Sequence, residues 1–200
     1  MESNDIGDIA RAVKQVLGQC ILTKGIKIDK LSTFDIEYLF LNVRGKSVGE
    51  TVDIKVTCPD DGVTTVPVTV DLDAIKVTFD PEHDKDIILD DKLKMRMKYP
   101  SLDEFIKENF QVDNVGFEQS IEMIATCVDM IYSEEETWTS ADFTQKEMID
   151  FLEGLGSKQF KELEKFFTTM PKLTHEIKVT NPKSKKENTI KLEGLAAFFN

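Results

Sequence analysis

The chain has few of the residues from which small domains build covalent or metal-bound frameworks. It holds three cysteines and two histidines in 200 residues, and an odd number of cysteines cannot all pair within one chain. A disulfide framework is therefore excluded, and a reduced, cytosolic setting is expected. A chain of this length needs neither bridge nor metal to fold, because it can bury roughly 70% of the surface that its unfolded form exposes.

Positive charge and long apolar runs are also scarce. The 25 Lys and Arg residues stand against 37 Asp and Glu, which gives a net charge of −12. This balance opposes general binding to nucleic acid or to anionic membranes, since both recruit dense Lys and Arg. No apolar run approaches the ~18–20 residues that span a bilayer, and the acidic segment Met1–Asp8 lacks the basic region of a secretory signal. We expect a soluble protein that binds neither nucleic acid nor membrane.

Motifs of enzymatic catalysis are missing as well. The sequence has no Gly-x-Ser-x-Gly elbow, phosphate-binding loop, dinucleotide-binding fingerprint or His-Glu-x-x-His motif. His83 and His175 have no nearby nucleophile with an obvious pairing, so both are expected at the surface. The acidic run Asp80–Asp91 has the spacing of a calcium loop, but Lys85 stands where that loop requires glycine. We therefore expect no enzymatic activity and no cofactor.

The hydrophobic pattern predicts an α+β fold. Apolar and polar residues alternate over Val52–Cys58 and Val66–Leu72, on either side of the turn Pro59–Gly62, which is typical of a β-hairpin. A second pair of short strands is expected at Glu176–Thr180 and Thr189–Leu192. Helical spacing marks the N-terminal part and most of the segment between the hairpins. It predicts helices over 6–20, 33–43, 101–110, 117–131, 145–155 and 157–170.

These elements suggest four consecutive regions. Residues 1–50 form an N-terminal helical region, and residues 51–100 form a β region that contains the first hairpin. Residues 101–171 form a helical insertion, and residues 172–200 form a second hairpin that returns to the first. The β domain is then discontinuous in sequence.

The two hairpins share a sequence repeat. Lys55–Gly62 and Lys178–Lys185 both begin Lys-Val-Thr-x-Pro at the junction of strand and turn. Two such turns with paired cysteines would build a zinc ribbon, in which four thiolates surround the metal. Here the four positions hold one cysteine and three poorer zinc ligands: Cys58, Asp61, Asn181 and Ser184. We predict a metal-free, zinc-ribbon-like unit held by packing; two unrelated hairpins with a shared proline turn are the alternative.

The remaining cysteines and the single tryptophan are candidates for packing or binding. Cys20 and Cys127 lie on apolar helix faces and are expected to be buried, whereas Cys58 at its turn is expected to be more exposed. Trp138 follows Glu134–Thr137 in a segment expected to link two helices. It either caps the helical cluster or anchors a partner, since Trp is enriched among interface hot spots. It is the only candidate for a partner-binding residue.

Three segments carry a family resemblance. Asp35–Glu50 resembles a segment common to baseplate proteins of T-even-like contractile-tailed bacteriophages. The same holds for Phe166–His175, which precedes the second turn, and for Leu192–Phe199. In that family the turns often carry paired cysteines, and this sequence departs from the pattern at Asp61, Asn181 and Ser184. The departure concerns metal binding rather than the fold.

The resemblance implies a role in the tail baseplate hub. Hub assembly factors act by holding other hub subunits, so we expect a non-enzymatic chaperone or scaffold in the host cytoplasm during phage assembly. A permanent structural subunit of the virion tail baseplate is the alternative, and a zinc-binding regulator or metal enzyme is a third candidate that the missing ligands disfavour. The acidic stretch Asp53–Asp91 and the Lys-richer stretch Lys158–Lys191 would guide docking more than they add affinity.

Overall fold

The computed structural model describes residues 6–101 and 117–198 and divides the chain into two compact units. We call Met1–Thr78 with Pro171–Asn200 the hairpin unit, and Phe79–Met170 the insert unit. The architecture mixes helices with antiparallel sheets, so the predicted α+β class is confirmed. The residues expected to form one β region, 51–100, contribute strands to both units. Within the described ranges, no helix combines the length and apolarity that crossing a membrane requires.

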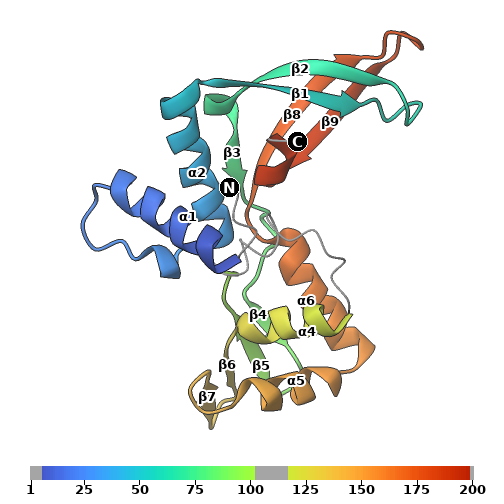
Figure 1. The fold of residues 1–200 in the computed structure, drawn as a ribbon. Helices are drawn as coiled ribbons and strands as arrows, with labels where there is room; N and C mark the ends of the chain where they lie inside the picture. The colour runs from blue at the N-terminus through green and yellow to red at the C-terminus, as the bar shows by residue number, and fades with distance from the viewer. Residues whose placement is uncertain (1–5, 102–116, 199–200) are drawn as a thin grey trace. The chain divides into compact units, whose positions relative to one another are not determined.

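The hairpin unit places two helices ahead of two small sheets (Figure 1). Strands β1 and β2 form a two-stranded sheet, and β8 lies between β3 and β9 in a three-stranded one. Helix α2 continues through the buried Gly45, where a stop was expected, and ends at Gly49. The elements are α1 (Ile6–Cys20), η1 (Ile28–Lys30), α2 (Thr33–Val48), β1 (Thr51–Thr57), β2 (Thr65–Asp71), η2 (Leu72–Ala74), β3 (Lys76–Thr78), β8 (Lys172–Thr180), β9 (Glu187–Glu193) and η3 (Leu195–Phe198).

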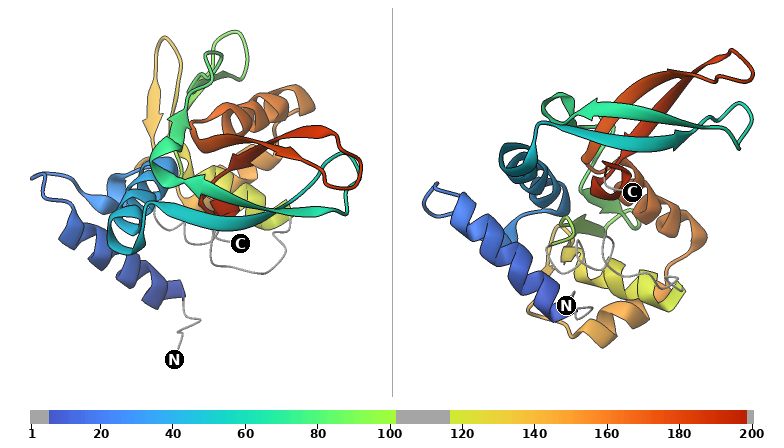
Figure 2. Two further views of the ribbon diagram at one scale, coloured as in Figure 1. Left: turned by 90° about the horizontal axis from the view of Figure 1, so that it is seen from above. Right: turned by 45° about the horizontal axis from the view of Figure 1, so that its top comes forward.

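Both predicted hairpins are confirmed. Strand β1 pairs antiparallel with β2, and β8 pairs with β9 over Thr174–Thr180. Burial follows the sequence repeat: Val56 and Val179 are buried at equivalent positions, and their polar neighbours on the strand are exposed. The two hairpins run together toward turns at the same end of the unit, as Figures 1 and 2 show. The alternating pattern therefore gives both hairpins one buried face and one exposed face.

The insert unit is a four-stranded antiparallel sheet with three described helices. Its strands follow the order β4-β5-β6-β7. The helix predicted over 117–131 is wrong in its second half, because Val128 and Ile131 lie on a strand; the helix predicted over 101–110 falls outside the described residues. The elements are β4 (Asp86–Ile88), β5 (Lys94–Met97), α4 (Phe117–Thr126), β6 (Val128–Tyr132), β7 (Thr137–Thr139), α5 (Gln145–Glu153) and α6 (Ser157–Thr169).

One row of side chains, which we call the core row, crosses the core face of this sheet. Ile87 lies opposite Met95, Met95 opposite Ile131, and Ile131 opposite Trp138. Cross-strand partners share a face, so the row ends at Trp138 on the edge strand β7. Trp138 is thus part of a strand, not of a linker between helices. The helices complete this core with a set of apolar residues: Ile121, Ile124, Met148, Leu152, Leu163 and Phe166.

Candidate functional site

The turns of the two hairpins share one closing hydrogen bond and one left-handed position, although the first turn is one residue longer. In the first, the Gly62 N–H donates to the Cys58 carbonyl at 2.9 Å; in the second, the Lys185 N–H donates to the Asn181 carbonyl at 2.9 Å. Gly62 has a φ of 67° and Lys185 a φ of 62°, so both turns close through a left-handed residue. Lys185 is the one non-glycine residue in the described ranges with a positive φ, a conformation that side chains disfavour. The sequence repeat is therefore also a structural repeat.

A network of hydrogen bonds joins the two turns. The Asn181 amide Nδ2 donates to Asp60 Oδ1 at 2.9 Å and to Asp61 Oδ2 at 3.0 Å. The other Asp60 contacts come from Asn188 Nδ2, at 3.1 Å, and from the Ser184 hydroxyl. Asn181 is fully buried, although both carboxylates lie at the surface. We call these five residues the turn cluster.

The same side chains also fix each turn internally. Asp61 Oδ1 accepts from the backbone N–H groups of Val63 and Thr64, at 3.0 and 2.9 Å. Asn181 Oδ1 accepts from the backbone N–H of Lys183 at 2.8 Å. Hydrogen bonds to a carboxylate favour its charged form, so those from Asn181 and Ser184 lower the pKa of Asp60. Those from Thr64 and Asn181 lower the pKa of Asp61. Both carboxylates therefore stay ionised at neutral pH and depend on Asn181 as a shared donor.

The turn cluster does not provide the ligands of a structural zinc site. Three of the four ribbon positions meet through hydrogen bonds: the Asn181 amide donates to Asp61, and the Asn181 amide oxygen accepts from the Ser184 backbone N–H at 3.3 Å. An amide nitrogen that donates protons cannot also coordinate a metal. Among the described residues, no three His, Cys, Asp or Glu side chains group in a way that could hold a metal ion.

Cys58 differs from its expected exposure. Its side chain is fully buried, because it continues the inward-facing positions of Ile54 and Val56. Burial raises the pKa of the Cys58 thiol, and the charges of Asp60 and Asp61 raise it further, which keeps the thiol protonated. Cys127 is buried as expected, whereas Cys20 is exposed at the end of α1.

Trp138 lies beside an apolar pocket of about 330 Å³ in the insert unit. The pocket continues the core row where the sheet ends, and Trp138 remains 40% exposed. Its lining is apolar except for two carboxylates: Leu93, Ile131, Trp138, Asp142, Phe143, Glu147, Met148 and Phe151. We call it the Trp138 pocket.

The two carboxylates at the Trp138 pocket are held in place by the local backbone. Asp142 accepts from the backbone N–H and hydroxyl of Thr139, at 2.7 and 2.8 Å. Glu147 accepts the same pair of bonds from Thr144, at 2.8 Å each, and completes the capping box of α5. These bonds lower the pKa of both carboxyls. The pocket rim is therefore negative at neutral pH.

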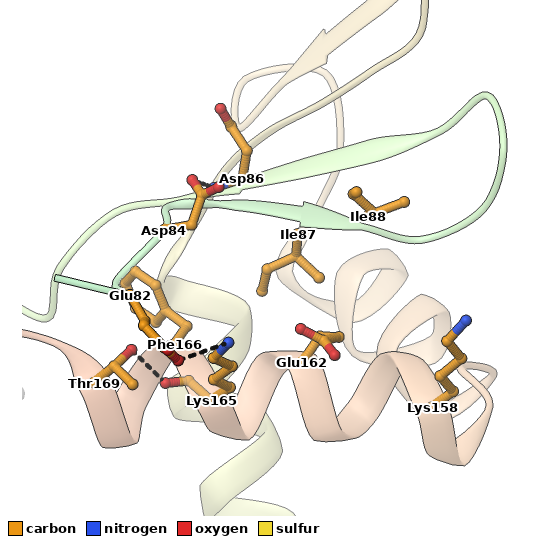
Figure 3. A pocket seen from close by; sticks show the side chains of 10 residues that line it. All are labelled: Glu82, Asp84, Asp86, Ile87, Ile88, Lys158, Glu162, Lys165, Phe166 and Thr169. Atoms are coloured by element: carbon orange, nitrogen blue, oxygen red, sulfur yellow. Dashed lines mark hydrogen bonds and ion pairs between the residues drawn. The ribbon is translucent and has the colours of Figure 1, made fainter. Parts of the chain in front are cut away.

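A second groove, of about 420 Å³, lies between β4 and α6 (Figure 3). Ile87 points toward the helix, while Ile88 on the same strand is 63% exposed. Charges of both signs line the groove, and the Lys165 ammonium lies 3.8 Å from the Glu82 carboxylate. The groove thus has no field of one sign that would select a charged ligand.

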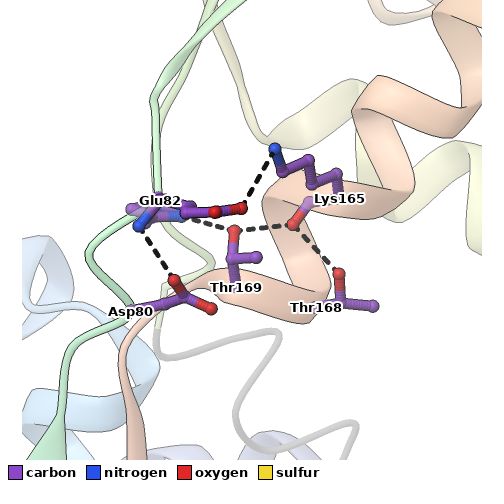
Figure 4. Close-up of polar contacts among 6 residues, drawn as sticks. Asp80, Glu82, Lys165, Thr168 and Thr169 are labelled. Atoms are coloured by element: carbon purple, nitrogen blue, oxygen red, sulfur yellow. Dashed lines mark hydrogen bonds and ion pairs between the residues drawn. The ribbon is translucent and has the colours of Figure 1, made fainter.

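His83 is not the surface histidine that the sequence suggested. Its ring lies half-buried against Tyr99 and Phe166, with centroid distances of 5.6 and 5.1 Å. Its Nδ1 is 3.0 Å from the hydroxyl of Thr169, which donates to the carbonyl of Lys165 (Figure 4). Burial lowers the pKa of His83, so the ring is neutral at pH 7 and serves the packing of α6.

Carboxylates of the nearby acidic loop accept hydrogen bonds from groups of the same chain. Asp80 and Asp84 each accept the backbone N–H two residues ahead, at 2.9 Å. Asp86 binds the Arg96 guanidinium through both oxygens, at 2.7 and 2.8 Å. The acidic side chains that have the spacing of a calcium loop therefore stabilise turns and an ion pair.

Sequence reasoning missed two members of the turn cluster. Asp60 occupies the variable position of the Cys-x-x-Cys pattern, and Asn188 lies on the buried face of β9 opposite Val179. A polar residue at an inward position of an alternating strand needs a buried partner. This rule could have identified Asn188 from the sequence.

Comparison with known proteins gives one family over the full length. No curated protein and no solved structure matches the chain significantly. The family model described as "T4 bacteriophage base plate protein" matches residues 1–200. This match covers both units and the linking segments. The chain belongs to the family of T4 bacteriophage base plate proteins.

Proposed function

We propose that the protein acts in assembly of the central hub of the tail baseplate, as a chaperone or scaffold that binds other hub subunits. It works in the host cytoplasm while the tail is built, and it acts by binding rather than by catalysis. Membership of a baseplate family supports the setting. The location in the central hub is the more specific part of the proposal.

The division of charge supports a role in holding partners. The insert unit contains 22 of the 37 acidic residues and 10 of the 25 basic ones, so it carries the whole net charge of −12. The hairpin unit is neutral by the same count. A concentrated field of one sign guides a partner of opposite sign and suppresses other encounters. This separation is the observation that carries the proposal, and it opposes nucleic acid and anionic membrane as ligands.

A permanent subunit of the virion baseplate is the second candidate. The turn cluster favours it, because hydrogen bonds between Asp60 and three residues of the other hairpin lock two ribbons into one element. A preorganised element loses little entropy on docking, which suits a stable structural contact.

We infer that the paired turns form a metal-free equivalent of a zinc ribbon. The matched backbone bonds at Cys58 and Asn181 support this inference. The turn cluster takes the place of the metal, so polar contacts hold the turns together in addition to the packing that was expected.

Copy number in finished particles separates the two candidates. Purified virions and baseplate assembly intermediates from the same infected culture are compared by quantitative mass spectrometry, with a known tail protein as the internal standard. An assembly factor is expected in intermediates but at least about tenfold depleted in virions. Stoichiometric copies in virions would instead establish the permanent subunit.

A further inference from the structure

Among the residues of the insert unit that the structure describes, the core is incomplete at the edge of the sheet. The core row reaches the solvent at Trp138, on a strand of three residues that pairs on one side only. The Trp138 pocket opens there, and Ile131 and Met148, which line it, also belong to the core. An apolar side chain of another molecule would extend the row by one member. The volume of the Trp138 pocket, about 330 Å³, is near the lower end of ligand pockets, roughly 300 Å³.

The charged side chains that line this opening are both acidic. Asp142 and Glu147 are the charged residues that line it. Glu134, Glu135 and Glu136, all exposed, form the turn between β6 and β7, and Glu136 lies two residues before Trp138. The pocket is therefore an apolar cavity with acid at both ends of its edge strand.

We propose that the Trp138 pocket binds a segment of a partner protein that inserts one large apolar side chain and carries Lys or Arg on both sides of it. The proposal deepens the proposed function, because it names the surface through which a baseplate partner is held. Trp138 packs against the inserted side chain and shields it from water. The carboxylates at Asp142, Glu147 and the Glu134–Glu136 turn attract the basic flanks and exclude acidic ones.

Tryptophan fluorescence of the full chain tests this directly, because Trp138 is the only tryptophan. The probes are three synthetic peptides: one with Leu-Phe between pairs of Lys, one with Gly-Gly between the same Lys, and one with Leu-Phe between pairs of Glu. The first peptide is expected to give a saturable blue shift in emission that weakens as salt is raised. The other two are expected to bind at least about tenfold more weakly.

Charge variants separate the local rim from the overall field. The triple variant Glu134→Lys, Glu135→Lys, Glu136→Lys is expected to weaken binding of the Lys-flanked peptide about tenfold. The control Glu153→Lys, Glu162→Lys, Glu164→Lys makes the same change in net charge at exposed sites of α5 and α6 that do not line the Trp138 pocket. It is expected to change binding less than twofold. Trp138→Ala, followed by calorimetry, is expected to remove binding.

Four outcomes would overturn the proposal. Equal binding of the Gly-Gly peptide would show attraction by charge alone, and equal binding of the Glu-flanked peptide would remove the role of the rim. A shift that depends on protein concentration without peptide would show that a second copy fills the pocket. No saturable shift with any peptide would show that the pocket binds none of them. The copy-number experiment does not depend on this pocket, so the two proposals fail separately.

Discussion

Replacement of Asn181 by Asp is expected to destabilise the hairpin unit strongly near neutral pH. The substitution removes both N–H donors of a fully buried side chain and puts a third carboxylate against Asp60 and Asp61. An uncompensated buried charge costs about 3–5 kcal/mol. We expect a loss of that size in the free energy of unfolding of the unit, which is a large share of the ~5–15 kcal/mol of a typical domain.

The loss should diminish in acid. One of the three crowded carboxyls has a pKa raised above its unfolded value of about 3.9, because its neighbours repel its charge. The destabilisation is therefore complete at pH above that raised pKa, and it shrinks as the pH falls through it. The wild type behaves in the opposite way, because the lowered pKa values of Asp60 and Asp61 contribute stability that is lost in acid.

Hydrogen exchange can measure this loss of stability, because it reports the protection of individual segments of the hairpin unit. Lys55–Cys58 and Lys178–Thr180 should lose protection together in the Asn181→Asp variant at pH 7. Asn181→Ala removes the donors without adding charge and should cost about 1–3 kcal/mol. Thr189→Asp adds the same charge at an exposed site of β9 and should change little. Loss of protection in one hairpin alone would contradict the account of a shared cluster.

Zinc should bind once four thiolates replace the turn cluster. The variant Asp60→Ser, Asp61→Cys, Asn181→Cys, Ser184→Cys keeps Cys58 and removes the carboxylate that lies between the turns. If the turns have the geometry of a zinc ribbon, the four sulfurs meet at one tetrahedral point. We expect one zinc per chain, with an apparent binding free energy of about 10 kcal/mol or more.

Elemental analysis and the visible spectrum of the cobalt-substituted variant measure this result. A tetrahedral cobalt spectrum and one metal per chain are expected, and the wild type treated in the same way should bind none. The same variant with Cys58→Ser keeps three thiolates and should bind zinc at least about a hundredfold more weakly. If the four-cysteine variant binds zinc no more tightly than this control, the ribbon-like account is wrong.

The sequence predicted the hairpins well because each strand faces one core. Period two at Val52–Cys58 and Glu176–Thr180 decides which residues turn inward, and Pro59–Gly62 supplies the turn. The pattern failed at Val128 and Ile131, where spacings of three and four are also consistent with a helix. Pairing with β5 and β7, which no local pattern shows, makes that segment a strand.

Prediction of the candidate sites was partial for a related reason. The repeat predicted that Cys58, Asp61, Asn181 and Ser184 would meet, and hydrogen bonds join the last three. Asp60 was missed because the spacing of zinc ligands in a Cys-x-x-Cys turn points to the first and fourth positions, Cys58 and Asp61. The environment of Trp138 depends on which strand lies at the sheet edge, and a single sequence does not contain that information.

A phage that lacks this chain tests the central claim most directly. Cells infected with a phage whose reading frame for this protein is interrupted are examined by electron microscopy, with the wild-type chain supplied from a plasmid as the control. We predict that complete baseplates disappear and return when the chain is supplied. Normal baseplates in normal number without the chain would contradict a role in baseplate assembly.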